Sequence, residues 1–310
     1  MSDPVPVQEV QTSRAGFVAL VGRPNAGKST LLNALLGQKL SIVSNKPQTT
    51  RHRVAGILTE PGYQVVFIDT PGMIEPKYLL QNAMMKMVQS ALRDADIVVR
   101  LVDASDDSAL RPDPGEEALL AHLKAPVLLV LNKADVASAD RMRTIAERSA
   151  AGPHPPLRVL QISALNKTGL DILRDEIVSR LPVHPAYYPD ESVSDRDERF
   201  FVAEIIREKV FECYREEIPY STTVRILAFE EKAGRKDRIE AEICVERDSQ
   251  KGILIGGKGA ALKKVGQLAR KDIEELLGRP VFLELRVKVR EKWRDSSVWL
   301  KRLGYTETNE

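Results

Sequence analysis

The chain has 310 residues, of which 43% are hydrophobic, and a net charge of +2. This length predicts two domains, each with its own core, and the near-neutral charge excludes a globally basic nucleic-acid binder, so RNA binding would need a local basic patch. A polar N-terminus, two cysteines without metal-ligand spacing and only short apolar runs favour a cytoplasmic protein over a secreted or membrane-inserted one.

After a flexible N-terminus at 1–14, residues 15–181 show the alternation of strands and helices that is typical of an α/β domain with a mostly parallel sheet. The predicted strands are 17–21, 54–58, 64–68, 97–102, 127–131 and 158–162. Polar clusters follow four of these strands, and ligands bind at the carboxyl ends of strands in such sheets. We therefore expect the four clusters to converge on one crevice. Arg100 interrupts an apolar strand, and we expect it at an edge or an interface.

The first cluster, residues 22–29, lies between the first strand and a helix predicted at 30–36, and it fits the pattern G-x-x-x-x-G-K-S. In such a loop the glycines let backbone N–H groups surround phosphate oxygens, and the following helix adds its positive N-terminal end. Lys28 would reach the β and γ phosphates, and the Ser29 hydroxyl would coordinate Mg²⁺. The predicted nucleotide contacts of this loop are Gly22, Arg23, Pro24, Asn25, Ala26, Gly27, Lys28, Ser29 and Thr30.

The other three clusters complete a predicted site for GTP or GDP with Mg²⁺. In the segment Asp69, Thr70, Pro71 and Gly72, the aspartate would hold Mg²⁺ through water and the Gly72 N–H would sense the γ phosphate. Asn132, Lys133 and Asp135 form a purine selector. The Asp135 carboxylate can accept from both guanine N1–H and the 2-amino group, and such pairing can reject the wrong base by about 10⁴ to 10⁵. After Ser163, the Ala164 N–H is expected at the guanine O6.

Together these clusters resemble the translation-factor-like GTPases. Arg23-Pro24-Asn25 and Thr49-Thr50-Arg51 narrow the resemblance to the Era-like branch. It implies a P-loop GTPase in which Thr50, rather than Thr49, joins the Mg²⁺ shell only when the γ phosphate is present. The predicted catalytic residues are Lys28, Thr50, Gly72 and Asn25, and the predicted metal ligands are Ser29, Thr50, Asp69 and, for K⁺, Asn25.

Two features bear on the rate of hydrolysis. Met73 occupies the position where Ras-like enzymes place a water-orienting glutamine, so we expect slow intrinsic hydrolysis. Asn25 matches the position that ligates K⁺ in potassium-dependent relatives, which gives the hypothesis that K⁺ accelerates turnover. The alternative is that Asn25 only stabilises the loop. Met84, Met85 and Met87, on the helix after this segment, are predicted to fill the core.

Residues 182–196 are proline-rich and are predicted to form an extended linker, followed by a second domain with a C-terminal tail at 197–310. Its predicted elements are a helix at 199–217, strands at 222–230 and 238–247, a helix ending near 255, a helix at 260–277 and a strand at 281–290. With Gly256-Gly257-Lys258-Gly259 between two helices, this order resembles a smaller α+β domain, the type II KH domain. Its G-x-x-G loop holds about four nucleotides of single-stranded RNA.

Cations alternate with apolar residues through Arg294 in the last strand, which at period two predicts a basic face. The alternative is a solvated charged surface without a ligand. The predicted RNA contacts are Ile255, Gly256, Gly257, Lys258, Gly259, Lys263, Arg286, Lys288 and Arg290.

With Trp293, Trp299 and Leu303-Gly304-Tyr305 in the tail, the resemblance to Era-like GTPases covers nearly the whole chain. It implies a monomer that binds the 3′ end of small-subunit ribosomal RNA, assists 30S subunit assembly and contacts the cytoplasmic face of the membrane peripherally. Two alternatives are a catalytically silent nucleotide sensor and a membrane-surface signalling GTPase whose basic face meets anionic lipid.

Overall fold

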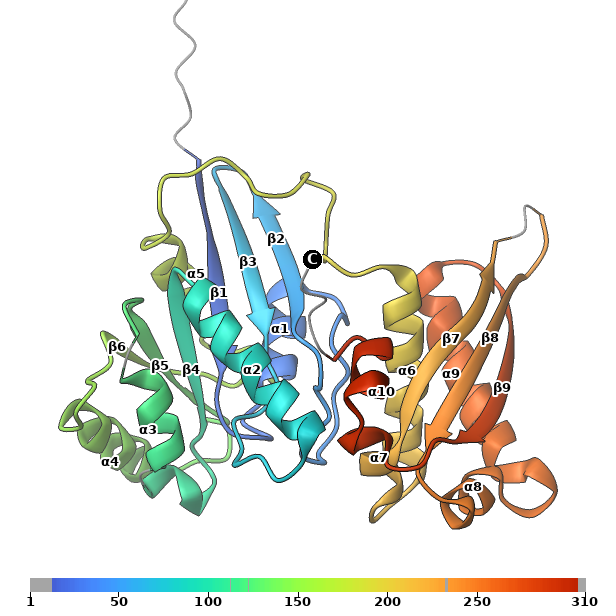
Figure 1. Cartoon of the computed structure of the whole chain (residues 1–310). Coiled ribbons are helices and arrows are strands. Elements are labelled where there is room, and N and C mark those ends of the chain that lie inside the picture. The colour runs from blue at the N-terminus through green and yellow to red at the C-terminus, as the bar shows by residue number, and fades with distance from the viewer. Residues whose placement is uncertain (1–12, 112, 122, 232–233, 306–310) are drawn as a thin grey trace, which may run out of the picture.

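The computed structural model of the protein describes residues 13–111, 113–121, 123–231 and 234–305 (Figure 1). A six-stranded sheet in the order β2-β3-β1-β4-β5-β6 forms the centre of the first domain. β2 pairs antiparallel with β3 across a tight turn, and the other neighbours pair parallel. The strands are β1 (Arg14–Val21), β2 (Val54–Glu60), β3 (Tyr63–Asp69), β4 (Ile97–Asp103), β5 (Val127–Asn132) and β6 (Arg158–Gln161). All six predicted strands and the mostly parallel sheet are confirmed.

Helices cover both faces of this sheet. They are α1 (Lys28–Leu36), α2 (Leu79–Asp94), η1 (Asp107–Leu110), α3 (Pro114–Leu120), α4 (Ala139–Ala150) and α5 (Leu170–Val178). Successive side chains of a strand point to opposite faces. In β1, Val18 and Leu20 accordingly pack with α1 and α5, whereas Ala19 and Val21 pack with α2. Met84 and Met85 are buried in the α2 cluster and Met87 packs against it, which confirms that these methionines fill the core.

Arg100 was expected at an edge or an interface, and because it lies in a central strand, the edge position is ruled out. Its guanidinium pairs with the buried carboxylate of Glu116 on α3, with Nε and Oε1 2.6 Å apart. Arg100 therefore sits at the packing interface between the sheet and a helix.

The second domain has a three-stranded sheet in the order β7-β8-β9, with β7 antiparallel and β9 parallel to β8. Helices α6 and α9 pack against one face of this sheet (Figure 1). The elements are α6 (Glu198–Cys213), α7 (Ile218–Ser221), β7 (Thr223–Glu230), β8 (Asp237–Val245), α8 (Asp248–Ile255), η2 (Gly257–Gly259), α9 (Ala260–Leu277), β9 (Val281–Val289), η3 (Trp293–Asp295) and α10 (Ser297–Arg302).

Two predicted elements of this domain end earlier than expected. The helix predicted to reach residue 217 stops at Cys213, because Tyr214 has an extended backbone (φ −118°, ψ 159°). Glu216 then turns left-handed (φ 54°), and Pro219 lies in the first turn of α7. The last strand ends at Val289 and Lys292 turns the chain with φ 49°, so the alternation does not continue to Arg294. This turn sends the tail back to the first domain.

The tail and the linker both contact the first domain. Trp293, Leu300 and Tyr305 belong to the α2 cluster, and α10 lies between the two domains (Figure 1). The linker residue Ser194 donates to the carbonyl oxygen of Ala55 on β2 at 2.6 Å. The predicted boundaries at 181 and 197 fall between α5 and α6.

Candidate nucleotide site

A cavity of about 360 Å³ lies where β1, β3, β4 and β5 end. It brings together the loop before α1, the segment 42–50, Gly72 and Lys133, which are far apart in sequence. The predicted residues that line it are Pro24, Asn25, Gly27, Lys28, Ser29, Thr30, Thr50, Gly72 and Lys133. Asp103 and Asp106 also line it and were missed. Their signal was available, because Asp103 is the polar residue that ends β4 at the same edge of the sheet.

Two glycines let the loop before α1 approach its neighbours closely. At Gly22 (φ 149°) an added Cβ would lie 2.2 Å from the Leu101 carbonyl oxygen, and at Gly27 (φ 97°) it would lie 2.2 Å from Asn132 Nδ2. A side chain at either position would collide with these atoms. The two glycines therefore let the backbone of the loop pack directly against Leu101 and Asn132.

Lys28 is buried at the base of the cavity. Its ammonium donates to the carbonyl oxygens of Gly22 at 3.0 Å and Arg23 at 2.9 Å, both within the loop. Burial lowers the pKa of Lys28 to about 8, although Asp69 and Glu116 oppose the shift. An anion in the cavity would stabilise the charged form, so this lysine is suited to bind phosphate.

Three oxygen groups predicted to hold Mg²⁺ meet beside Lys28. Ser29 Oγ lies 2.8 Å from Thr50 Oγ1 and 2.8 Å from Asp69 Oδ2. Among the described residues, the buried Asp69 Oδ1 has no hydrogen-bond partner. Burial raises the pKa of Asp69, and the Ser29 hydroxyl and Lys28 offset part of this shift. Oxygens of this kind are the ligands that Mg²⁺ prefers, so the residues fit the ion.

At the base-binding end, Asn132 ties two loops together. Its Nδ2 donates to the Ala26 carbonyl oxygen at 2.8 Å, and its Oδ1 accepts from the Ala164 N–H at 3.0 Å. The contact of the Ala164 N–H with guanine O6 stays a prediction, and it requires sharing this hydrogen bond. Asp135 is exposed in the turn after β5, and Lys133 Nζ pairs with Asp103 Oδ2 at 2.6 Å.

Five of the predicted contacts have other partners or are buried. The Arg23 guanidinium points away from the cavity and donates to the Ser108 carbonyl oxygen at 2.7 Å, which fixes the segment after β4. Thr70 is buried and donates to the Leu20 carbonyl oxygen at 2.8 Å. Ala26 and Ser163 are buried in the loops that flank Asn132. Pro71 lies between Thr70 and Gly72.

The segment 43–52, which contains Thr50, is docked on the second domain. We call it the switch segment. Arg51 is 1% exposed, and its guanidinium donates to three carbonyl oxygens at the end of α7, at 2.7, 2.9 and 3.0 Å. The acceptors are Thr222, Pro219 and Tyr220. Arg51 also lies over the Phe211 ring, 5.8 Å from its centroid.

Helix α6 holds the same segment from a second side. The Val43 N–H donates to Glu208 Oε1 at 3.0 Å, and buried Arg207 donates to the Thr49 carbonyl oxygen at 2.5 Å. Lys46 Nζ donates to the carbonyl oxygens of Phe211 and Tyr214 near the end of α6. Thr50 is therefore flanked by residues that are anchored in the other domain.

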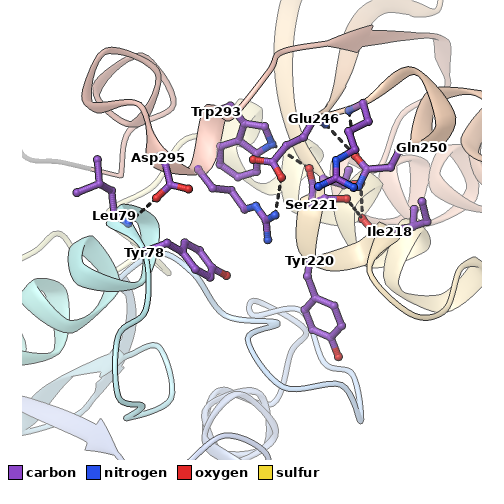
Figure 2. A network of polar contacts seen from close by, with 12 residues as sticks. Tyr78, Leu79, Ile218, Tyr220, Ser221, Glu246, Gln250, Trp293 and Asp295 are labelled. Carbon is purple, nitrogen blue, oxygen red and sulfur yellow. Dashed lines mark hydrogen bonds and ion pairs between the residues drawn. The ribbon is translucent and has the colours of Figure 1, made fainter.

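The C-terminal tail completes this contact between the domains. Tyr305 stacks on buried His52 with ring centroids 4.3 Å apart, and burial lowers the pKa of His52 to about 4, so the imidazole is neutral. Figure 2 shows Asp295 accepting from the Leu79 N–H, 3.2 Å away, at the start of α2. It also shows Trp293, whose Nε1 donates to the Ser221 carbonyl oxygen at 2.8 Å.

The predicted RNA loop, residues 256–259, lies at the N-terminal end of α9. Gly256 (φ 69°) has no room for a Cβ, which would lie 2.6 Å from the Ala261 side chain, and Lys258 is exposed at φ 50°. A groove of about 370 Å³ runs from this loop between α9 and β9. It is lined by Gly259, Leu262, Lys263, Gly266, Gln267, Arg270, Phe282, Leu283 and Leu285. Gly259 and Lys263 were predicted RNA contacts, whereas Phe282 was missed.

The predicted basic face of β9 is partly neutralised by acidic neighbours. Arg286 pairs with Glu284 at 2.8 Å, and Arg290 pairs with Glu242 at 3.0 Å while lying over the Trp299 ring. Lys288 remains exposed on the strand. The helical residues among those described include no stretch long and apolar enough to cross a bilayer.

Comparison with known proteins finds a matching family for each of the two domains. The sequence matches the family described as 50S ribosome-binding GTPase over residues 17–133 and the KH domain family over residues 217–294. It is 48% identical over 301 residues to "GTPase Era" of Geobacter metallireducens, covering 94% of this chain and 98% of the relative. It is also 46% identical over 298 residues to "GTPase ERA-like, chloroplastic" of Arabidopsis thaliana, covering 94% and 69%.

Two solved structures match nearly the whole chain. One is Era in complex with MgGDPNP and nucleotides 1506–1542 of 16S ribosomal RNA, with a TM-score of 0.89 and 37% identity over 95% of this chain and 100% of that one. The other is an Aquifex aeolicus Era variant bound to GDP and AlF4⁻, with a TM-score of 0.89, 36% identity and the same coverage.

Proposed function

Because the chain belongs to the Era family of GTPases, we propose that it is a cytoplasmic, monomeric GTP-hydrolysing switch that binds the 3′ end of small-subunit ribosomal RNA and assists 30S assembly. The predicted P-loop GTPase domain and KH domain are confirmed. The RNA target is supported by the similar structure that holds nucleotides 1506–1542 of 16S ribosomal RNA. The observation that supports a switch is the position of Thr50, between the predicted Mg²⁺ site and the docked KH domain.

Different residues in and around the cavity bind the phosphates, the base and the metal ion. The backbone of the loop before α1 and Lys28 bind the phosphates, and Asp135 selects the base. Ser29, Thr50 and, through water, Asp69 would hold Mg²⁺, which when bound neutralises charge that develops on the phosphate oxygens. The Gly72 N–H donates to the γ phosphate. When hydrolysis removes that phosphate, this hydrogen bond is lost, and the segment that leads to α2 is released.

Nucleotide state and domain docking are coupled through one short segment. Thr50 joins the Mg²⁺ shell only while the γ phosphate is present, and its neighbours Thr49 and Arg51 contact the KH domain. If GTP favours the docked arrangement, docking must favour GTP by the same factor. RNA that prefers one arrangement would then change the affinity for nucleotide.

RNA binding in the two nucleotide states tests this function. An oligonucleotide with the sequence of the 3′ end of 16S ribosomal RNA should bind with different affinity in the presence of GDPNP and of GDP. Lys263→Ala should weaken binding, because Lys263 lines the groove, whereas the neighbouring exposed Lys264 does not and its alanine variant is the matched control. Raising the salt should weaken binding with a slope of about −0.7 per phosphate contact. Equal affinity for a scrambled oligonucleotide would contradict the proposed target.

Slow intrinsic hydrolysis and K⁺ stimulation are further parts of the proposal. Met73 is 6% exposed within the α2 cluster, so its side chain offers nothing to a water in the cavity. Asn25 Nδ2 donates to the carbonyl oxygen of Asn45 in the switch segment at 3.1 Å, which places amide and carbonyl oxygens of the kind that K⁺ binds near one another. Turnover should be faster in KCl than in NaCl, and Asn25→Ala should abolish the difference. Equal rates in the two salts would refute the K⁺ hypothesis.

A membrane contact is proposed as peripheral and weak. The pairing of Arg286 and Arg290 with glutamates leaves fewer cations for anionic lipid. Flotation with anionic liposomes, in the presence and absence of competing RNA, measures it. Flotation that RNA does not reduce would show that lipid and RNA use different surfaces.

A further inference from the structure

The cavity lacks a water-orienting side chain at the position after Gly72. Met73 points into the α2 cluster, and its N–H donates to the Gly22 carbonyl oxygen at 3.1 Å, which fixes this orientation. Hydrolysis needs a group that holds a water in line with the bond that breaks. Another residue facing the cavity must supply it.

Several polar residues of the switch segment line the cavity, and Gln48 is distinguished among them by its backbone and by the partner of its amide. It lines the same cavity as Lys28, Ser29 and Gly72, two positions before Thr50. Its backbone has φ 59°, a left-handed conformation that a non-glycine residue adopts uncommonly. Such strain persists only where the surroundings impose it, and it concentrates at functional sites.

The surroundings impose this conformation from both ends of the turn. The Thr49 Oγ1 donates to the Lys46 carbonyl oxygen at 2.7 Å, which closes the turn around Gln48. Lys46 and Thr49 are in turn anchored to α6 through the contacts described above. The strained backbone is therefore kept by the docked KH domain.

The side chain of Gln48 is oriented by Tyr78, at the start of α2. The Tyr78 hydroxyl donates to Gln48 Oε1 at 3.2 Å. The Arg294 guanidinium lies over the Tyr78 ring, 5.0 Å from its centroid, and pairs with Glu246. Figure 2 shows Tyr78 below the tail, beside the contact between Leu79 and Asp295. Because the phenol occupies one lone pair of Oε1, the other lone pair and the Nε2 hydrogens remain for a water and a phosphate oxygen.

We propose that Gln48 is the catalytic residue that orients the attacking water in GTP hydrolysis, and that Tyr78 is its positioning residue. The water oxygen forms a bond to the γ phosphorus, the bond from that phosphorus to the β–γ bridging oxygen breaks, and GDP leaves. The water protons end on the released inorganic phosphate and in bulk solvent. This inference rests on GTP hydrolysis as the reaction of the site.

Single-turnover hydrolysis by the full chain in KCl tests the assignment. Gln48→Gly is the decisive variant, because glycine accepts the left-handed backbone and removes only the amide. We expect its rate to fall by about 10- to 100-fold, the size expected for misplacing a reacting group. The affinity for GDPNP should remain within about two-fold of wild type, since the switch segment stays docked. Gln48→Ala should lose as much activity and in addition destabilise the turn.

A double-mutant cycle with Tyr78→Phe separates catalysis from structure. Tyr78→Phe should lower the rate several-fold in the wild-type background and leave it unchanged in the Gln48→Gly background, because its effect passes through the amide. A wild-type rate in Gln48→Gly, or an equal loss from Tyr78→Phe in both backgrounds, would overturn the inference. A wild-type protein without turnover would instead overturn the proposed function itself.

Discussion

Replacing Arg51 by alanine is expected to uncouple nucleotide state from domain docking. The guanidinium donates three hydrogen bonds, at 2.7, 2.9 and 3.0 Å, to carbonyl oxygens of the other domain. Hydrogen bonds to charged groups contribute about 1.5–3 kcal/mol each, so three would contribute roughly 5–9 kcal/mol if the carbonyls stayed dry. The carbonyls regain water when the domains separate, and burying the guanidinium has its own desolvation cost. We therefore expect a loss of about 2–4 kcal/mol, or roughly 30- to 700-fold in the docking equilibrium.

The assay compares GTP-state with GDP-state affinity. Thr50 contributes only when the γ phosphate is present, so Arg51→Ala should weaken GDPNP binding with Mg²⁺ while GDP binding stays near wild type. Titration calorimetry measures both. Arg53→Ala is the matched control, because it removes the same charge two residues away while the Arg53 side chain pairs with Asp94 inside the first domain, at 2.6 Å.

Three outcomes separate the explanations. A ratio of GDPNP to GDP affinity that Arg51→Ala leaves within two-fold of wild type would refute the reasoning. An equal change in Arg53→Ala would assign the effect to charge alone. Small-angle scattering on Arg51→Ala with GDPNP should show a larger radius of gyration than wild type, because the domains separate.

Three other predictions concern single groups. Asp135→Asn should reduce the preference for guanosine over adenosine nucleotides from about 10⁴ to 10² or less, because the paired acceptor is lost; competition binding measures this ratio, and an unchanged preference would contradict the assigned role of Asp135. The free-protein pKa of Lys28 is about 8 and phosphate binding should raise it, so nucleotide affinity is complete below pH 8 and is lost as the pH rises. We expect a fall of up to about tenfold per pH unit, with proton uptake detectable by calorimetry in two buffers at pH 8.5; no uptake there would exclude a titrating Lys28. Arg290→Ala should lower the free energy of unfolding in urea by about 1–3 kcal/mol, because buried Glu242 loses the nearer of two arginine partners and keeps Arg225, at 3.7 Å; a loss of RNA affinity without a loss of stability would instead place Arg290 in the RNA contact.

The sequence was sufficient where each functional group is fixed by its own strand. Lys28, Asp69 and Asn132 follow or end strands whose apolar patterns are local, and parallel strands bring those ends to one edge. The residues that surround the cavity could therefore be grouped from the strand pattern alone. Asp103 could have been found by the same rule.

What the sequence did not predict depends on partners far away in the sequence or on single dihedral angles. Arg51 meets the end of α7 and Lys46 meets α6 only because the tail and linker bring the domains together. No local pattern marks such pairs. Likewise, Glu216 is a good helix former that turns left-handed, and Glu242 neutralises Arg290 from a neighbouring strand.

The stacking of Tyr305 on His52 sets an order of events during synthesis. A nascent chain delivers the P-loop domain first, and the tail residues Trp293 and Tyr305 emerge on the order of ten seconds later, at about 5–20 residues per second. In that interval the face of α2 and the ring of His52 lack their cover. At the start of that interval the residues of the second domain that contact the switch segment have not yet been synthesised. The contacts of Tyr305 and Trp293 with the first domain can therefore form only when synthesis of the chain is nearly complete.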